Sequence, residues 1–213
     1  MRGSPCLLPA PQYACIGCGR AYWHPTLEPL CRRCELQLGE LAIEPDWTVA
    51  APFQYAGPLA RPLAGLKYGG DLAVARPLAR RWTRRWSALG IRRDTLLVPV
   101  PAPWHRRLSR GVPHVHLLAW WLKVEGATGD LRCQHTLRQR RGPRQVGLSR
   151  TARLENMRGR FRCDLSDAAL RGADVVVVDD VVSTGATLQA CMDAIRPARP
   201  ARLRGLALLQ RVA

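Results

Sequence analysis

Val175-Val176-Val177-Val178-Asp179-Asp180 leads without a break into Val181-Val182-Ser183-Thr184-Gly185-Ala186-Thr187, near the end of a 213-residue chain. The four leading valines are β-branched and do not alternate with polar residues, which predicts a strand covered on both faces. Strands of this kind belong to parallel sheets between helix layers, so the stretch predicts an α/β fold. The two acids are expected at the carboxyl end of the strand, where open α/β sheets bind ligands.

The residues after the acids have the chemistry of a sugar-phosphate site. Ser183, Thr184 and Thr187 offer hydroxyls, Gly185 allows a tight turn, and residues 188–195 have the apolar spacing of a helix. The loop therefore precedes a helix N-terminus, whose free N–H groups favour a phosphate. The carboxylates repel a phosphate but suit the vicinal hydroxyls of a ribose. The alternative is a strand, a turn and a helix cap without a ligand. A Walker-type loop fits less well, because Gly-Lys-Ser and Gly-Lys-Thr do not occur.

Two CxxC pairs near the N-terminus predict a structural zinc module. Cys15 and Cys18 form the first pair, and Cys31 and Cys34 form the second, twelve residues later. Each pair can hold one side of a tetrahedral Zn²⁺, and four thiolates leave no open position for catalysis. Four reduced cysteines without a metal are the alternative. His24 lies between the pairs and could replace one ligand.

The composition suggests a polyanionic partner. Lys and Arg total 33 against 16 Asp and Glu, which gives a net charge of +17. Nucleic acid, phosphates or an acidic surface would all match this excess. No apolar run is long enough for a membrane span, and the first residues do not read as a signal peptide. We therefore expect a cytoplasmic protein whose cysteines are reduced or bound to metal.

The middle of the chain contains two basic stretches that follow predicted structure. Residues 95–101 predict a second buried strand, and Arg106 and Arg107 follow it as candidates for binding pyrophosphate. Residues 137–150 are dense in arginine and have no apolar period. They predict either a mobile basic loop that closes over a pyrophosphate or a solvated charged loop.

A third basic stretch follows Asp71, where apolar residues recur at helical spacing up to Leu89. Trp82 and Trp86 lie on the apolar side of this predicted helix. The other side carries Arg80, Arg81, Arg84 and Arg85. A solvated basic face over core tryptophans is the favoured interpretation.

The thirteen residues 175–187 resemble the phosphoribosyl-pyrophosphate (PRPP) signature of type I phosphoribosyltransferases. The resemblance implies that Asp179 and Asp180 hold the ribose 2′- and 3′-hydroxyls. It also implies a 5′-phosphate loop consisting of Val181, Val182, Ser183, Thr184, Gly185, Ala186 and Thr187. A Mg²⁺ ion would bridge pyrophosphate and ribose oxygens and be held largely by the ligand. Arg106, Arg107 and Arg140 are the candidates for stabilising the leaving pyrophosphate.

Further motifs, in order, resemble the ComF family of competence proteins over nearly the whole chain. These are the four cysteines, Lys67-Tyr68-Gly69-Gly70-Asp71, Val98-Pro99-Val100-Pro101, Arg140 to Gln145, Arg153-Leu154-Glu155-Asn156, and the signature. The family usually has Arg-Gly-Phe-Asn-Gln where this chain has Arg110-Gly111-Val112-Pro113-His114. The resemblance implies a type I phosphoribosyltransferase fold at 46–213, preceded by a zinc module at 1–45.

The resemblance also implies a role in DNA uptake during natural transformation. PRPP or ribose 5-phosphate would be the ligand, and single-stranded DNA the macromolecular partner. A competence helicase or other DNA-uptake proteins are further expected partners. The basic excess, the zinc module and Trp23, Trp82 and Trp86 are compatible with single-strand binding by phosphate contacts and stacking. Two alternatives remain: an active phosphoribosyltransferase with an unknown acceptor, and a PRPP-sensing regulator.

Overall fold

A six-stranded sheet forms the centre of the fold, and every strand pairing within it is parallel. The computed structural model describes residues 13–22, 28–102, 113–126, 132–133, 137–139, 159–164 and 168–211. The strand order is β3-β10-β9-β5-β6, and β4 also pairs with β10. The bounds are β3 Val49–Ala50, β4 Phe53–Gln54, β5 Leu96–Pro99, β6 Arg132–Cys133, β9 Asp174–Val182 and β10 Arg202–Gln210. The predicted parallel α/β fold is therefore confirmed.

Helices cover both faces of this sheet. The α-helices are α1 Arg32–Glu35, α2 Gly57–Ala64, α3 Ala75–Thr83, α5 His114–Glu125 and α7 Ala186–Ile195. Shorter turns are η1 Gly65–Gly69, η2 Leu72–Val74, η3 Ala168–Leu170 and η4 Arg196–Ala198. Two small antiparallel pairs lie outside the sheet: β1 Tyr13–Ala14 with β2 Ala21–Tyr22, and β7 Leu137–Gln139 with β8 Phe161–Cys163. The first residues of the predicted basic loop at 137–150 are thus the strand β7.

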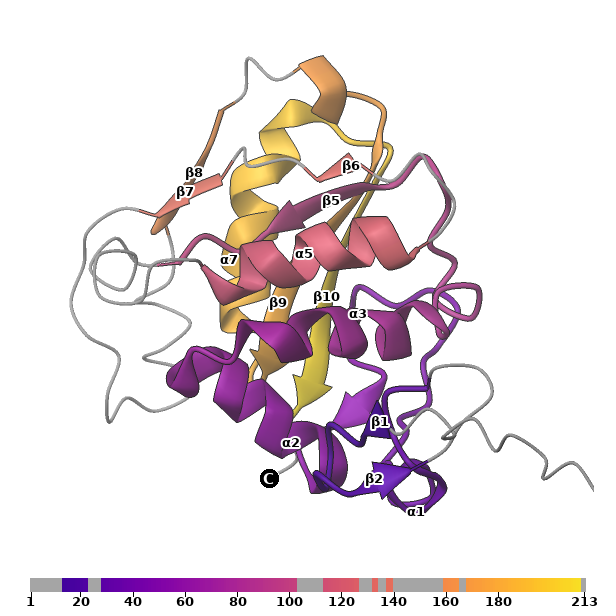
Figure 1. Ribbon diagram of the computed structural model, residues 1–213. Coiled ribbons are helices and arrows are strands. Elements are labelled where there is room, and N and C mark those ends of the chain that lie inside the picture. The colour runs from indigo at the N-terminus through magenta and orange to yellow at the C-terminus, as the bar shows by residue number, and fades with distance from the viewer. Residues whose placement is uncertain are drawn as a thin grey trace, which may run out of the picture.

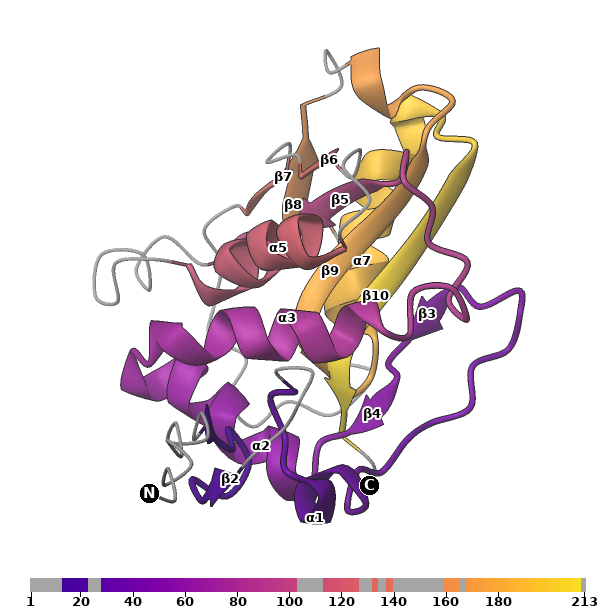
Figure 2. The same cartoon turned by 45° about the vertical axis from the view of Figure 1, so that its right-hand side comes forward.

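Strand β9 lies between the two helix layers, as its unbroken run of valines predicts. Val176 and Val178 belong to one apolar cluster with residues of α2, α3 and α5, whereas Val175 and Val177 belong to a second cluster with residues of α7. This division follows from the alternation of side chains along a strand. Figures 1 and 2 show α3 and α5 on one side of the sheet and α7 on the other. The alternation also places the two adjacent acids on different faces.

A buried ion pair joins the amino ends of β9 and β10. Arg204 Nη2 donates to both oxygens of Asp174 at 3.1 and 2.9 Å, and the two side chains are 4% and 2% exposed. Thr95 Oγ1 donates to Asp174 at 3.1 Å, and the Arg204 guanidinium lies 4.6 Å from the ring centre of Trp47. Arg204 Nη1 also donates to the Leu89 carbonyl at 2.9 Å. The network connects β9 and β10 with the segments that precede β3 and β5.

The N-terminal segment packs directly on the helix layer that contains α2. Cys15, Leu30 and Cys34 are buried in the same apolar cluster as Leu59 and Leu63 of α2. A side chain at Gly17 would bring its Cβ within 2.6 Å of the Pro58 Cβ, so only glycine permits this approach. Figures 1 and 2 show β2 and α1 beside α2. The segment and the sheet domain therefore share a core, and the boundary at residue 45 stays a prediction.

The arginines at positions 80–85, in α3 and the turn after it, form the solvated face that the sequence favoured only in part, because Arg84 is exposed and Arg81 is not. Arg81 is buried and contacts Glu35 at 2.6 Å and Glu40 at 3.0 Å. Arg85 contacts Glu40 at 2.7 Å, and Arg84 pairs with Glu28. All three acids come from the N-terminal segment, so attraction between opposite charges supplements the apolar contact. Arg81, Arg84 and Arg85 therefore form ion pairs within the chain.

The helical periodicities of the other segments are confirmed. α5 buries Val115, Leu118 and Leu122, and α7 buries Leu188, Cys191, Met192 and Ile195. Pro77 lies in the first turn of α3, where the missing N–H has no helical partner to lose. Within the described part of the chain, we find no helix with the length and apolar character of a membrane span.

Candidate functional site

The signature folds as a strand, a short loop and a helix. β9 continues two residues past the acids, to Val182, so Asp179 and Asp180 lie near the carboxyl end of the strand, as predicted. Ser183 to Gly185 form the loop, and α7 begins at Ala186. Gly185 has φ +75°, a left-handed conformation that side chains other than glycine rarely adopt. The Thr184 hydroxyl accepts a hydrogen bond from the Ala186 N–H at 3.4 Å.

The two acids have different surroundings. Asp180 is buried on the face that carries α5, and Asp179 is partly buried on the face that carries α7. The Asp179 carboxylate accepts a hydrogen bond from the Asp180 N–H at 2.8 Å. Burial and the charge of Asp179 raise the pKa of Cys191 on α7 well above its usual range. The pair is therefore not symmetric, although the sequence presents two identical side chains.

Two basic side chains hold Asp180 from outside the signature. Lys67 Nζ lies 3.0 Å from Oδ1 and 2.8 Å from Oδ2, so it contacts both oxygens. His114 Nε2 lies 2.6 Å from Oδ2. Lys67 comes from η1 and His114 is the first residue of α5. Sequence reasoning assigned neither residue a role. The only available signals were the Lys67-to-Asp71 motif and the departure from the family pattern at His114.

These contacts separate the ionisation of the two acids. Burial, together with the charge of Asp180, raises the pKa of Asp179 to about 8. Burial acts in the same direction on Asp180, but the hydrogen bond with His114 and the charge of Lys67 outweigh it and lower the pKa of Asp180 to about 2. Near neutral pH the pair therefore carries one negative charge, which Lys67 balances. A site with so little net charge can accept a polyanionic ligand.

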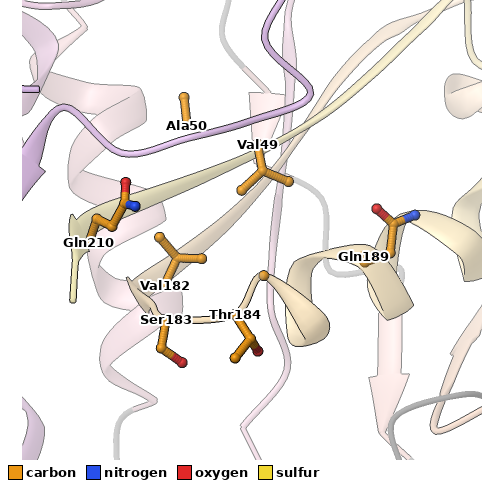
Figure 3. Close-up of a pocket in the computed structure, with 8 residues that line it drawn as sticks. Val49, Ala50, Val182, Ser183, Thr184, Gln189 and Gln210 are labelled. Atoms are coloured by element: carbon orange, nitrogen blue, oxygen red, sulfur yellow. The ribbon is translucent and has the colours of Figure 1, made fainter. Parts of the chain in front are cut away.

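A pocket of about 340 Å³ lies beside the signature loop (Figure 3). Ser183, Thr184 and Gly185 form one part of its wall, and Gln189 contributes from α7. Val49, Ala50, Val182 and Gln210 complete the lining from the neighbouring strands. The predicted 5′-phosphate loop thus borders a cavity at the carboxyl ends of β9 and β10. This position matches the ligand position of open α/β sheets.

Several predicted site residues lie outside the described part of the chain. These are Arg106, Arg107 and Arg140, together with the remainder of the basic loop at 140–150 and the Arg153–Asn156 motif. Their assignment to pyrophosphate stays a prediction. Trp23 and His24 also lie outside it. Trp82 and Trp86 are 0% and 6% exposed, so the suggestion that they stack on nucleic-acid bases is wrong.

The four predicted cysteines form a cluster that fits a metal ion. The Sγ atoms of Cys15, Cys18, Cys31 and Cys34 all lie within 4.8 Å of one another, and Cys18 and Cys31 are 3.8 Å apart. Four thiolates at ~2.3 Å from a tetrahedral Zn²⁺ would be separated by ~3.8 Å. The donor set is all sulfur, which suits zinc and disfavours magnesium or calcium. The predicted ligand residues are therefore brought together as expected.

Replacing one of these ligands is expected to destabilise the sheet domain as well as the N-terminal segment. Cys34→Ser should release the metal and lower Tm by ~10 °C or more, because structural zinc supplies folding free energy that exceeds one side chain's packing. The effect spreads because Cys15 and Cys34 share a core with α2. Metal content and thermal unfolding measure the outcome. Cys163→Ser, outside the cluster, is the control. An unchanged Tm in Cys34→Ser would contradict the prediction.

The sequence of this chain is similar to those of known proteins. The model of the phosphoribosyl transferase domain family matches residues 110–212. Competence protein ComFC of Bacillus subtilis is 25% identical over 182 residues, covering 83% of this chain and 68% of that protein. Competence protein F of Haemophilus influenzae is 26% identical over 209 residues, covering 83% of this chain and 87% of that protein. A hypoxanthine phosphoribosyltransferase structure from Trypanosoma cruzi is 18% identical, with a TM-score of 0.37, and covers 67% of this chain and 68% of that one.

The parallel sheet, the acid pair in its central strand and the matched domain define a phosphoribosyltransferase-like protein. The four-cysteine cluster and the similarity to two competence proteins over 83% of the chain support the resemblance to the ComF family.

Proposed function

We propose that this protein binds PRPP and supports DNA uptake in natural transformation by handling single-stranded DNA. The observation that carries the PRPP part is the acid pair Asp179–Asp180 near the end of the central strand, followed directly by a Ser183–Gly185 loop that borders a pocket before α7. Hydroxyl groups of a ribose can donate to the acids, and the N–H groups at the start of α7 can donate to a phosphate. The relatives named as competence proteins support the part that concerns DNA.

We further propose that Zn²⁺ occupies the four-cysteine cluster and that Mg²⁺ accompanies PRPP. Zn²⁺ would hold the N-terminal segment together and take no part in a reaction. Mg²⁺ would neutralise phosphate charge, with most of its ligands supplied by PRPP and water. A site of four thiolates is typical of a reducing compartment, which supports the cytoplasm as the location. A competence helicase or another DNA-uptake protein is the expected protein partner.

The PRPP proposal is tested by thermal unfolding in the presence of PRPP and Mg²⁺. At a ligand concentration ~100 times Kd, binding adds ~2.7 kcal/mol to the free energy of unfolding. For a chain of this size that amount raises Tm by ~5–10 °C. Ribose 5-phosphate should give a smaller shift, and pyrophosphate alone should not reproduce the effect. A Tm that PRPP leaves unchanged at millimolar concentration would contradict the proposal.

Single-stranded DNA binding is expected to weaken steeply with salt. The chain carries +17 net charge, so binding should rest mainly on phosphate contacts and counterion release. If about four phosphates are neutralised, the logarithm of the association constant should fall with log salt at a slope of ~−3. Fluorescence anisotropy with a labelled oligonucleotide measures this slope, and a duplex of equal length is the control. A slope near zero, or no binding at low salt, would refute the DNA proposal.

The alternative is an active phosphoribosyltransferase, with which the matched domain is also compatible. Such an enzyme would release pyrophosphate from PRPP when an acceptor attacks C1, with Arg106, Arg107 and Arg140 stabilising the leaving group. Both functions require PRPP binding, but only the enzyme would convert PRPP to products. Pyrophosphate release that depends on an added acceptor would support the enzyme, and binding without release would support the DNA-handling protein.

A further inference from the structure

The helix α2 ends in an unusual turn that points to a function. Residues Gly65–Gly69 form the π-helical turn η1, and Gly70 follows in a left-handed conformation with φ +69°. Its N–H and that of Asp71 are directed at the Gly65 carbonyl, which closes the turn. π-helical turns are rare, and proteins often place them at functional sites. Here the turn carries Lys67, the residue that contacts the signature acid.

Lys67 and His114 reach Asp180 from sequence positions on either side of β5. The ammonium of Lys67 contacts both Asp180 oxygens, at 3.0 and 2.8 Å, and the His114 ring contacts Oδ2 at 2.6 Å. The side chains of Lys67 and His114 are 20% and 14% exposed, against 6% for Asp180. The carboxylate therefore lies beneath its two partners. The orientation and the charge of the Asp180 carboxylate therefore depend on Lys67 and His114 as well as on β9.

A buried carboxylate without partners is costly to ionise and free to rotate. Contacts with Lys67 at both oxygens remove this freedom, and the ion pair compensates for the lost hydration. The charge of Asp180 would otherwise repel any phosphate ligand. Lys67 brings a positive charge to the pair.

We propose that Lys67 and His114 are positioning residues for PRPP binding. They hold the Asp180 carboxylate ionised and in one orientation, and Lys67 offsets the negative charge that the acid pair presents to a polyanionic sugar phosphate. The inference rests on the proposed PRPP function and extends its site to two elements outside the signature, η1 and α5. The inference also gives a physical reason for the Lys67-to-Asp71 motif, because the turn that contains Lys67 brings its ammonium to the carboxylate of Asp180, which is distant in sequence.

The first test compares PRPP affinity, by calorimetric titration with Mg²⁺, in the wild type and three lysine variants. Lys67→Met should weaken binding roughly 10- to 100-fold, the range for losing a hydrogen bond to a charged group. Lys67→Arg keeps the charge and two donors and should recover most of the affinity. Lys123→Met is the matched control, because Lys123 lies on α5 against the exposed Trp120. Its affinity should equal that of the wild type.

The second test asks whether Lys67 acts through Asp180. In the Asp180→Asn background, Lys67→Met should change PRPP affinity less than about twofold, since coupled residues are not additive. An equal loss in both backgrounds, or wild-type affinity in Lys67→Met, would overturn the inference. His114→Ala should give a smaller loss than Lys67→Met, because Lys67 still contacts both oxygens. If the wild type binds PRPP and Lys67→Met binds it equally well, this inference is wrong and the proposed function stands. If the wild type does not bind PRPP, both the inference and the proposed function are wrong.

Discussion

Replacing both signature acids, by Asp179→Asn with Asp180→Asn, is expected to weaken PRPP binding by ~100-fold or more. Each acid is proposed to accept a hydrogen bond from a ribose hydroxyl, and a bond to a charged group contributes ~1.5–3 kcal/mol. The exchange keeps the size of both side chains, removes the charge of Asp180 and replaces one carboxyl oxygen of each acid by an NH2 donor. Thermal unfolding with PRPP and Mg²⁺ measures the result: the rise in Tm seen in the wild type should disappear.

The single variants Asp179→Asn and Asp180→Asn should differ in thermal stability, because the two acids have different surroundings in the structure. Asp180→Asn also leaves the Lys67 ammonium without its carboxylate, so it should lower Tm in the absence of ligand. Asp179→Asn should leave this Tm closer to that of the wild type, since burial already raises the pKa of Asp179 to about 8 and keeps it neutral at pH 7. Asp193→Asn, the same exchange on the exposed side of α7, is a control for general effects near this helix. Full PRPP binding by the double variant would show that the ligand lies elsewhere.

Loss of the buried carboxylate at position 174 should be the most destabilising single change in the sheet domain. Asp174→Ala is expected to lower the free energy of unfolding by ~3–5 kcal/mol, because it leaves the Arg204 guanidinium buried and unpaired. For a chain of this length the change corresponds to a fall in Tm of ~6–20 °C. The pair lies at the amino ends of β9 and β10, opposite the signature loop, so PRPP affinity of the folded fraction should be unaffected.

A matched comparison isolates the contribution of burial in this ion pair. Arg92 and Asp94 form a pair at 3.6 Å in which the side chains are 66% and 75% exposed, and Asp94→Ala should cost less than ~1 kcal/mol. The double change Asp174→Ala with Arg204→Met should be less harmful than the sum of the single changes, because no unpaired charge remains buried. Equal effects of Asp174→Ala and Asp94→Ala would contradict the argument.

Residues 175–187 contained most of what was needed to predict the fold. An unbroken run of β-branched residues can be buried on both faces only in a sheet between two layers, and this is the position of β9. Spacing alone likewise predicted the four-cysteine cluster, because two CxxC pairs have few arrangements other than a shared metal. The signature loop and the start of α7 also match their prediction, since Gly185 and the helical periodicity are local properties.

Contacts between distant segments were not predictable in the same way. The basic side of α3 looked like a solvated face, but Glu28, Glu35 and Glu40 of the N-terminal segment pair with it. A helix pattern shows which side is polar and does not show what covers that side. For the same reason, Trp82 and Trp86 could be suggested as stacking residues until their burial was known.

By itself, the sequence determined the central strand, the loop and helix after it, and the metal-binding cysteines, because each depends on residues close together in the chain. Only the tertiary structure decided how the acid pair is held. Asp179 and Asp180 are identical in the sequence, but strand alternation places them on opposite faces, and Lys67 and His114 join Asp180 from two other elements. Ionisation and orientation depend on the charges that surround a carboxylate in space, and those charges are assembled only when the chain folds.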